Sequence, residues 1–273
     1  RCYPGEEIHL NNRLKINPHV INFGGRCGVM RFASEHRAEF EALVDAIAAS
    51  LPPGLDEFNR LQVAYTEAAF RKIRDFGGVA VYSHPYWRVG GDRFYVTPET
   101  QETLLARGNF DAVEVISGYS RPAMEENQLS AARFADLRAQ GRKIAAVGVS
   151  DAHGYEEDHP YYPWFAWYYT IVFAETPEFA ELAAGIRARR SVAVEAVQGE
   201  FPRIYGEFRF VKYAYFLLRE VLPEHDRLCR TEGELLLRAL HGDVAAAAAL
   251  KLLKGSVAAL YRKLWQPPER QRF

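Results

Sequence analysis

Short apolar runs alternate with longer amphipathic stretches up to about residue 195, and this alternation constrains the fold more than any other feature. The apolar runs have the length of strands and cover residues 20–23, 79–82, 112–116, 144–149, 169–173 and 191–194. Between them, residues 35–49, 55–75 and 122–140 carry apolar side chains at helical spacing. Strands that alternate with helices are typical of βαβ units, and uninterrupted apolar strands indicate a sheet covered on both faces. The sequence therefore predicts an α/β protein with a mainly parallel sheet or barrel.

The pattern changes near Phe201-Pro202, after which no alternation of strands and helices continues. Residues 205–222, 231–241 and 244–264 instead read as helices, and Asp243 is a suitable N-terminal cap for the last of them. We therefore expect two domains, an α/β domain over residues 1–198 and a helical extension over residues 199–273.

The composition disfavours several classes of protein. Lys plus Arg is 34 and Asp plus Glu is 35 in 273 residues, and this net charge of −1 is unlike that of a generic polyanion binder. The longest uncharged aromatic run, residues 161–174, is shorter than the ~20 residues that span a bilayer, so we expect no membrane association. The three cysteines form no CxxC pair, which disfavours a disulfide framework or thiolate zinc site and indicates a reducing, cytoplasmic compartment.

Carboxylates and imidazoles cluster at the ends of the predicted strands. Asp151 and His153 follow the strand that ends near residue 149, and their i, i+2 spacing in extended chain directs both to one side. His84 follows the strand that ends at residue 82, and Pro85 restricts the loop after it. Taken singly, these residues also suit a loop aspartate with a surface histidine, or a buried structural histidine.

Two more segments add donors of the same kind. In Gly5-Glu6-Glu7-Ile8-His9 the two acids point to opposite faces, and Glu7 shares a face with His9. His19 opens another strand. A solvated strand edge and a structural histidine are the alternatives. Together, oxygen and nitrogen donors without thiolates suit Zn²⁺, Mn²⁺ or Fe²⁺ rather than Ca²⁺.

These segments resemble the PHP (polymerase and histidinol phosphatase) family of metallohydrolases in type and in order. The matching segments are Pro4-Gly5-Glu6-Glu7-Ile8, Asn17-Pro18-His19-Val20, Val81-Tyr82-Ser83-His84-Pro85, Val113-Glu114-Val115-Ile116-Ser117-Gly118 and Gly148-Val149-Ser150-Asp151-Ala152-His153-Gly154. The resemblance implies a distorted (β/α)7 barrel with two or three divalent ions (Mn, Zn or Fe) at the carboxyl ends of the strands. It implies that Glu7 bridges metals and that His19, His84, Asp151 and His153 are further ligands, with Glu7, His84, Asp151 and His153 catalytic.

The departure from the family pattern concerns its first segments. The family opens with a His-x-His strand followed by a "TDH" segment, and neither occurs in this sequence. We therefore expect the chain to begin after the first βα unit of the barrel, with a preceding piece of roughly 60–90 residues. If the chain is whole, the metal centre lacks several ligands.

Four further residues are candidates for supporting roles. His9 shares a face with Glu7, and Glu114 lies within an apolar strand, where a carboxylate needs a partner. Arg88 and Arg121 follow strands and suit bidentate phosphate binding, although each also suits a surface position. An aromatic group suits either a substrate cleft or a packed layer under the helical extension, and it comprises Tyr161, Tyr162, Trp164, Trp167 and Tyr168.

The sequence leaves three functions open. The first is a metal-dependent phosphoesterase that hydrolyses a phosphate ester with metal-activated water, acting on a small phosphorylated substrate or on a nucleotide or oligonucleotide. The second is an amidohydrolase-like reaction on the same barrel. The third is a catalytically incomplete scaffold that binds a protein partner of unknown kind.

Overall fold

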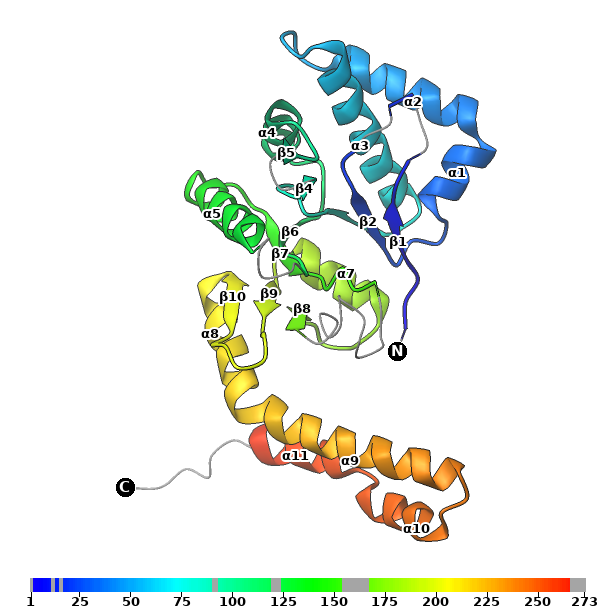
Figure 1. Ribbon diagram of the computed structural model, residues 1–273, viewed down its shortest axis with the longest axis vertical. Helices are drawn as coiled ribbons and strands as arrows, with labels where there is room; N and C mark the ends of the chain where they lie inside the picture. Colours follow the sequence, from blue (N-terminus) through cyan, green and yellow to red (C-terminus); the bar gives the residue numbers. More distant parts are fainter. Residues whose placement is uncertain are drawn as a thin grey trace. The chain divides into compact units, whose positions relative to one another are not determined.

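A five-stranded mixed sheet forms the centre of the N-terminal part of the chain in the computed structural model (Figure 1). Its strands, in spatial order, are β1 (Gly5–Ile8), β2 (Val20–Phe23), β3 (Val79–Tyr82), β6 (Ala112–Ile116) and β7 (Ala145–Gly148). The structure describes residues 2–10, 13–14, 17–89, 93–118, 124–153 and 167–265.

The strand directions correct the expectation of a mainly parallel sheet. The β3–β6 and β6–β7 pairs are parallel, but the β1–β2 and β2–β3 pairs are antiparallel. The connection from β1 to β2 is short, and antiparallel neighbours need no crossover helix between them. Only β3, β6 and β7 therefore have the parallel arrangement that the alternation of strands and helices predicts.

A second sheet of three antiparallel strands lies against β7. It consists of β8 (Tyr168–Val172), β9 (Ser191–Glu195) and β10 (Arg203–Gly206), in the order β10-β9-β8. The Ser191 hydroxyl donates to the Ala146 carbonyl at 2.8 Å, and the Thr170 hydroxyl donates to the Gly148 carbonyl at 2.7 Å. The pairings within the described ranges close no barrel, so the predicted (β/α)7 barrel stays a prediction.

Two helices of the N-terminal unit begin at residues whose side chains cap them. The N-terminal unit contains α1 (Val29–Glu35), α2 (Arg37–Ser50), α3 (Glu57–Asp75), α4 (Pro98–Arg107), α5 (Glu125–Ala139) and α7 (Phe179–Arg187). The Asn59 amide donates to the Asp56 side chain at the start of α3, and Thr97 accepts from Thr100 at the start of α4, where Pro98 occupies the first turn. Strands β4 (Arg88–Val89) and β5 (Arg93–Phe94) form a separate two-stranded ribbon.

The core lies on both faces of the sheet, as the uninterrupted apolar strands predict. On β3, Ala80 and Tyr82 join the cluster that α3 covers, whereas Val79 and Val81 join a second cluster that includes Ile186 of α7. This alternation follows from the two-residue period of a strand.

The C-terminal part of the chain is helical in the residues that the structure describes. The chain divides into two compact units, Arg1–Val211 and Lys212–Phe273. Helix α8 (Phe208–Phe216) leads into a π-helical turn over Leu217–Val221, then α9 (Leu222–Leu240), α10 (Val244–Leu253) and α11 (Ser256–Trp265). The wide turn ends two residues before Pro223, which lacks an amide hydrogen and cannot complete a regular ladder of helical hydrogen bonds.

The predicted helix over residues 205–222 begins later in the structure, at Phe208. Residues 203–206 form strand β10 instead of entering a helix, because they pair with β9; the domain boundary after residue 198 stays a prediction. By length and composition the stretch Val244–Leu264 passes as a membrane span, with a mean hydropathy of 1.4. The absence of a membrane partner therefore also stays a prediction.

The contact between β7 and the second sheet depends on Gly148. A β-carbon there would lie 2.8 Å from the Tyr169 carbonyl oxygen and 3.3 Å from the Val194 nitrogen, and both are backbone atoms. We expect Gly148→Ala to lower the free energy of unfolding by about 1–3 kcal/mol, measured by urea denaturation. Gly233→Ala, in open space on α9, is the control and should be neutral or stabilising by up to about 1 kcal/mol. Equal stability of the two variants would contradict this role of Gly148.

Candidate metal centre

Strand register brings the first two candidate ligands to one face of the sheet. Glu7 pairs with Ile21 across the β1–β2 ladder. His19 lies two residues before Ile21, directly ahead of β2. Side chains two residues apart share a face, so Glu7 and His19 are diagonal neighbours. The next ladder pairs Ile21 with Val81, and His84 follows that strand three residues later. The sheet thus gathers these side chains at one edge.

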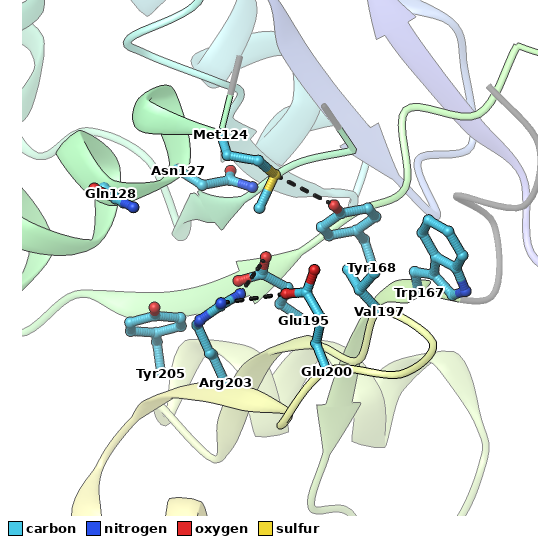
Figure 2. Close-up of a pocket in the computed structure, with 10 residues that line it drawn as sticks. All are labelled: Met124, Asn127, Gln128, Trp167, Tyr168, Glu195, Val197, Glu200, Arg203 and Tyr205. Carbon is cyan, nitrogen blue, oxygen red and sulfur yellow. Dashed lines mark hydrogen bonds and ion pairs between the residues drawn. The ribbon is translucent and has the colours of Figure 1, made fainter. Parts of the chain in front are cut away.

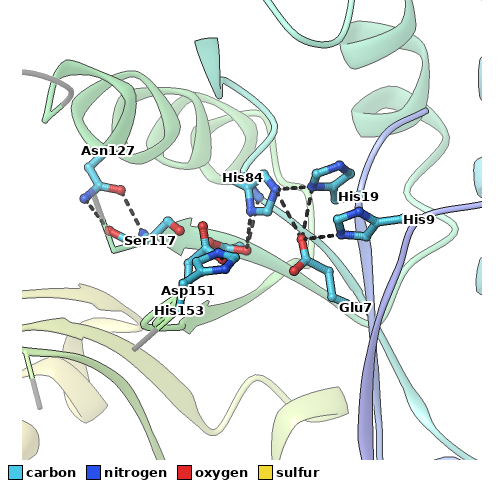
Figure 3. A network of polar contacts seen from close by, with 9 residues as sticks. Glu7, His9, His19, His84, Ser117, Asn127, Asp151 and His153 are labelled. Carbon is cyan, nitrogen blue, oxygen red and sulfur yellow. Dashed lines mark hydrogen bonds and ion pairs between the residues drawn. The ribbon is translucent and has the colours of Figure 1, made fainter. Parts of the chain in front are cut away.

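Three donor atoms converge at this edge (Figure 3). The His19 Nδ1 atom lies 3.0 Å from Glu7 Oε1 and 2.8 Å from His84 Nε2, and the Glu7 Oε1 to His84 Nε2 distance is 3.6 Å. Donors around a tetrahedral ion with bonds of about 2.0–2.1 Å lie about 3.3 Å apart, within the range of these three separations. Three electron-rich atoms this close repel one another unless a proton or a cation lies among them. The donor set therefore fits a divalent ion that accepts oxygen and nitrogen ligands.

The electrostatics of the three groups differ. Burial by itself raises the pKa of Glu7, but the His19 hydrogen bond and the nearby histidine charges outweigh it and lower this pKa to about 2. Burial lowers the pKa of His19. Burial also acts downward on His84, yet the Glu114 carboxylate and more distant acids raise the pKa of His84 to about 8. The Glu7 carboxyl is thus ionised over the physiological pH range.

Glu114 supports His84 from behind. Its carboxylate, with the residue 1% exposed, accepts the His84 backbone amide hydrogen at 3.1 Å and lies 3.4 Å from Nδ1 of the ring. A carboxylate behind the distal nitrogen fixes the orientation of a metal-binding histidine. The His84 contacts supply partners that a carboxylate so deeply buried needs, and the supporting role of Glu114 in a metal site stays a prediction.

Glu6 anchors the strand that carries Glu7. Because neighbouring side chains alternate, Glu6 points away from the donor cluster and accepts the amide hydrogens of Val29 at 2.7 Å and Met30 at 2.9 Å. These are the first amides of α1, which has no side-chain cap of its own and no acid in its first turn. The carboxylate thereby replaces a local cap and interacts favourably with the helix dipole.

Asp151 and His153 lie beside the cluster without belonging to the tight trio. His153 Nε2 is 3.1 Å from Asp151 Oδ1, and Figure 3 shows both next to His84. The charge of Asp151 contributes to the raised pKa of His84, while burial raises the pKa of Asp151 itself. Among the described residues, His84 and Asp151 are two of three non-glycine residues with positive φ, at 20° and 47°. Such strain is typical of functional sites.

The remaining candidates have different surroundings. The His9 Nε2 atom lies 3.3 Å from Glu7 Oε1, and its ring stacks on His19 with centroids 4.0 Å apart, so the structure brings it to the cluster. The Arg88 guanidinium forms an ion pair with Glu125 and packs over Phe94, which is the surface position weighed as its alternative. Arg121 lies outside the described residues, as do Tyr161, Tyr162 and Trp164.

Two residues were missed from the sequence. Glu6 is separated by more than twenty positions from the amides that it caps, and no local pattern joins them. Glu195 ends the apolar strand β9 and lines a cavity together with Trp167 and Tyr168 (Figure 2). A charged residue that closes an apolar strand was the signal that led to His84 and Asp151, and it would also have led to Glu195.

Comparison with known proteins finds a distant structural likeness. No family model matches the chain, and no curated protein matches its sequence. A crystal structure of a two-domain protein from Bacteroides vulgatus, described as containing a predicted PHP-like metal-dependent phosphoesterase, is 17% identical, with a TM-score of 0.39. The match covers 69% of this chain and 43% of that chain, so this chain spans less than half of its neighbour. At this distance the family assignment stays a prediction from the motifs.

The Glu6 contacts give a first test of the site's framework. Glu6→Ala removes the acceptor of two helix-terminal amides, and we expect it to lower the free energy of unfolding by about 1–2 kcal/mol. Glu35→Ala, at the other end of α1, removes only an exposed pair with Arg31 and should cost less than about 0.5 kcal/mol. Urea denaturation measures both. A cost for Glu6→Ala no larger than that for Glu35→Ala would refute the anchoring role.

Glu126 gives a pH-dependent test. Its carboxylate is buried, accepts the Arg88 amide hydrogen at 3.2 Å, and has a second oxygen without a hydrogen-bond partner. Burial raises the pKa of Glu126 from 4.5 to about 6. The protonated form therefore favours the fold below pH 4.5, and this contribution is lost as the pH rises through about 6.

We expect Glu126→Gln to stabilise the protein by about 1–2 kcal/mol at pH 8 and to leave stability unchanged near pH 4. The control Glu125→Gln removes the same charge from an exposed neighbour and should lack this pH-dependent gain. The measurement is the free energy of unfolding of each variant at the two pH values. An equal gain for Glu126→Gln at both pH values would contradict a raised pKa of Glu126.

Proposed function

We propose that this chain is the metal-binding part of a PHP-like metal-dependent phosphoesterase. The observation that carries the proposal is the convergence of Glu7, His19 and His84, whose donor atoms lie within 3.6 Å of one another. A divalent ion held there would polarise a phosphate oxygen and lower the pKa of its bound water toward neutrality. The order of the motif segments supports the family, and the neighbouring Asp151 and His153 supply donors for further ions.

The protein groups have separate tasks in this proposal. Glu7 provides the fixed negative charge that offsets the charge of an ion. Glu114 holds the His84 ring in one orientation, so that Nε2 faces the cluster. His153 is largely exposed and hydrogen-bonded to Asp151, so it can exchange a proton with solvent at the edge of the site. The substrate proposed is a small phosphate ester, with a nucleotide as the other candidate.

Metal binding is tested before hydrolysis. Isothermal titration of Mn²⁺ and Zn²⁺ into the purified chain should give saturable binding that weakens at least tenfold in Glu7→Ala, His19→Ala and His84→Ala. His241→Ala, on an exposed histidine at the end of α9, is the matched control and should bind as the unmodified chain does. Binding that is indifferent to the three cluster substitutions would exclude this centre.

Hydrolysis is tested with the metal-loaded chain on a panel of phosphomonoesters, phosphodiesters and amides. We expect turnover of a phosphate ester that falls by at least a hundredfold in the Asp151→Ala, His153→Ala double variant. Turnover that survives this double substitution would refute the mechanism, and turnover of amides alone would favour the amidohydrolase-like reaction. Metal binding without any turnover would favour the scaffold function.

A further inference from the structure

The last two helices form an apolar stretch that is mostly exposed among the described residues. Helices α10 and α11 both pack on α9, and all three belong to the C-terminal unit Lys212–Phe273 (Figure 1). The stretch Val244–Leu264 has a mean hydropathy of 1.4 over 18 residues, of which 6% are buried. Apolar helices of soluble domains are normally covered, so this exposure indicates a surface that has a partner.

One face of α10 carries the largest exposed side chains of this stretch. Val244 is 82% exposed and Leu252 is 86% exposed, and Ala248 between them is exposed as well. These three residues follow one another at four-residue spacing, so they share one face of the helix. Ala246, which is buried, lies on the opposite side. Helix α10 thus turns Ala246 toward its own unit and presents Val244 and Leu252 to solvent.

All charges of this stretch are positive. Residues 244–264 contain no Asp or Glu, and their four basic residues are Lys251, Lys254, Arg262 and Lys263. All four are exposed, and Lys251 lies on the same face of α10 as Ala248, three residues before it. Long basic side chains can lay their stems along an apolar surface and extend their charge beyond it. An apolar helix face accompanied only by basic residues complements a surface of anionic lipids.

The break between α10 and α11 favours a position on the membrane over a span across it. Gly255, with φ at 86°, separates the two helices, which have ten residues each. At about 1.5 Å per residue each helix is about 15 Å long, half of the roughly 30 Å hydrocarbon core. In a continuous span Lys254 would lie near the middle of the bilayer, where a charge is costly.

Two other occupants fit this surface less well. A second copy of the chain, packed through the same face, would bring the lysines of both copies together. A nucleic acid would complement the basic residues, but its phosphates would leave Val244 and Leu252 without an apolar partner. Packing of this face against the N-terminal unit is a further alternative, which the experiment below distinguishes.

We propose that the exposed face of α10 and the basic residues after it bind an anionic phospholipid membrane, with both helices lying in the plane of its surface. Val244 and Leu252 would enter the apolar boundary, and Lys251 and Lys254 would contact phosphate headgroups. This proposal replaces the expectation of no membrane association, which was based on residues 161–174. It requires no metal ion, so it stands or falls separately from the phosphoesterase proposal.

The test is co-sedimentation of the full chain, in the presence of EDTA, with two kinds of vesicle. One contains phosphatidylcholine alone, and the other contains phosphatidylcholine and phosphatidylglycerol in equal parts. We expect binding to the anionic vesicles to be at least tenfold stronger. It should fall at least tenfold in the Val244→Gln, Leu252→Gln double variant, and also in the Lys251→Gln, Lys254→Gln double variant. Because all four side chains are exposed, circular dichroism should show an unchanged fold.

Each double variant has a matched control in the N-terminal unit. Phe208→Gln removes an apolar side chain that is 81% exposed, and the Arg71→Gln, Lys143→Gln double variant removes two exposed positive charges. Both controls should bind the anionic vesicles as the unmodified chain does.

Three results would overturn the proposal. The first is no preference for anionic vesicles, or an equal loss of binding in a control variant. The second is self-association of the chain that the Val244→Gln, Leu252→Gln substitution abolishes, because it would assign the face to a second copy. The third is a lower urea midpoint for that double variant than for Phe208→Gln, because it would assign the face to the N-terminal unit.

Discussion

The register of the β1–β2–β3 ladders is the constraint on which the rest of the site depends. Glu7, Ile21 and Val81 lie in one cross-strand row, and this row fixes which face the Glu7 side chain points to. A slip of one residue in the β1–β2 ladder would move Glu7 to the opposite face of the sheet, away from His19. On β1, Ile8 is buried in the core cluster on the face opposite to Glu7, and a slip of β1 would remove Ile8 from that cluster.

The adjacent acids Glu6 and Glu7 point to opposite faces of β1, so this strand contacts both helix α1 and the donor cluster. The Glu6 carboxylate accepts hydrogen bonds from the first amides of α1, and the Glu7 carboxylate lies beside His19 and His84. Behind His84, the Glu114 carboxylate contacts the backbone amide and the ring of that histidine. The buried carboxylate of Glu114 and the His84 ring thus offset each other, and a partner of this kind lowers the cost of burying a charge.

Local sequence signals predicted the strands and helices well, because apolar period and capping residues act over a few positions. Asp243 marked the start of α10, and the polar residues after strands marked the candidate ligands. The predictions that failed depend on long-range pairing. The direction of β1 and β2 and the existence of β10 follow from which strands become neighbours, and no window of sequence contains that information.

The sequence by itself determined the strand and helix segments and the chemical types of the donors at the strand ends. Only the tertiary structure decided which donors meet. It united Glu7, His19 and His84, placed Asp151 and His153 at their side, and paired Arg88 with Glu125. The reason is physical: a donor atom acts within a few ångströms, and such closeness between distant residues is set by strand register and packing, which the whole chain fixes together.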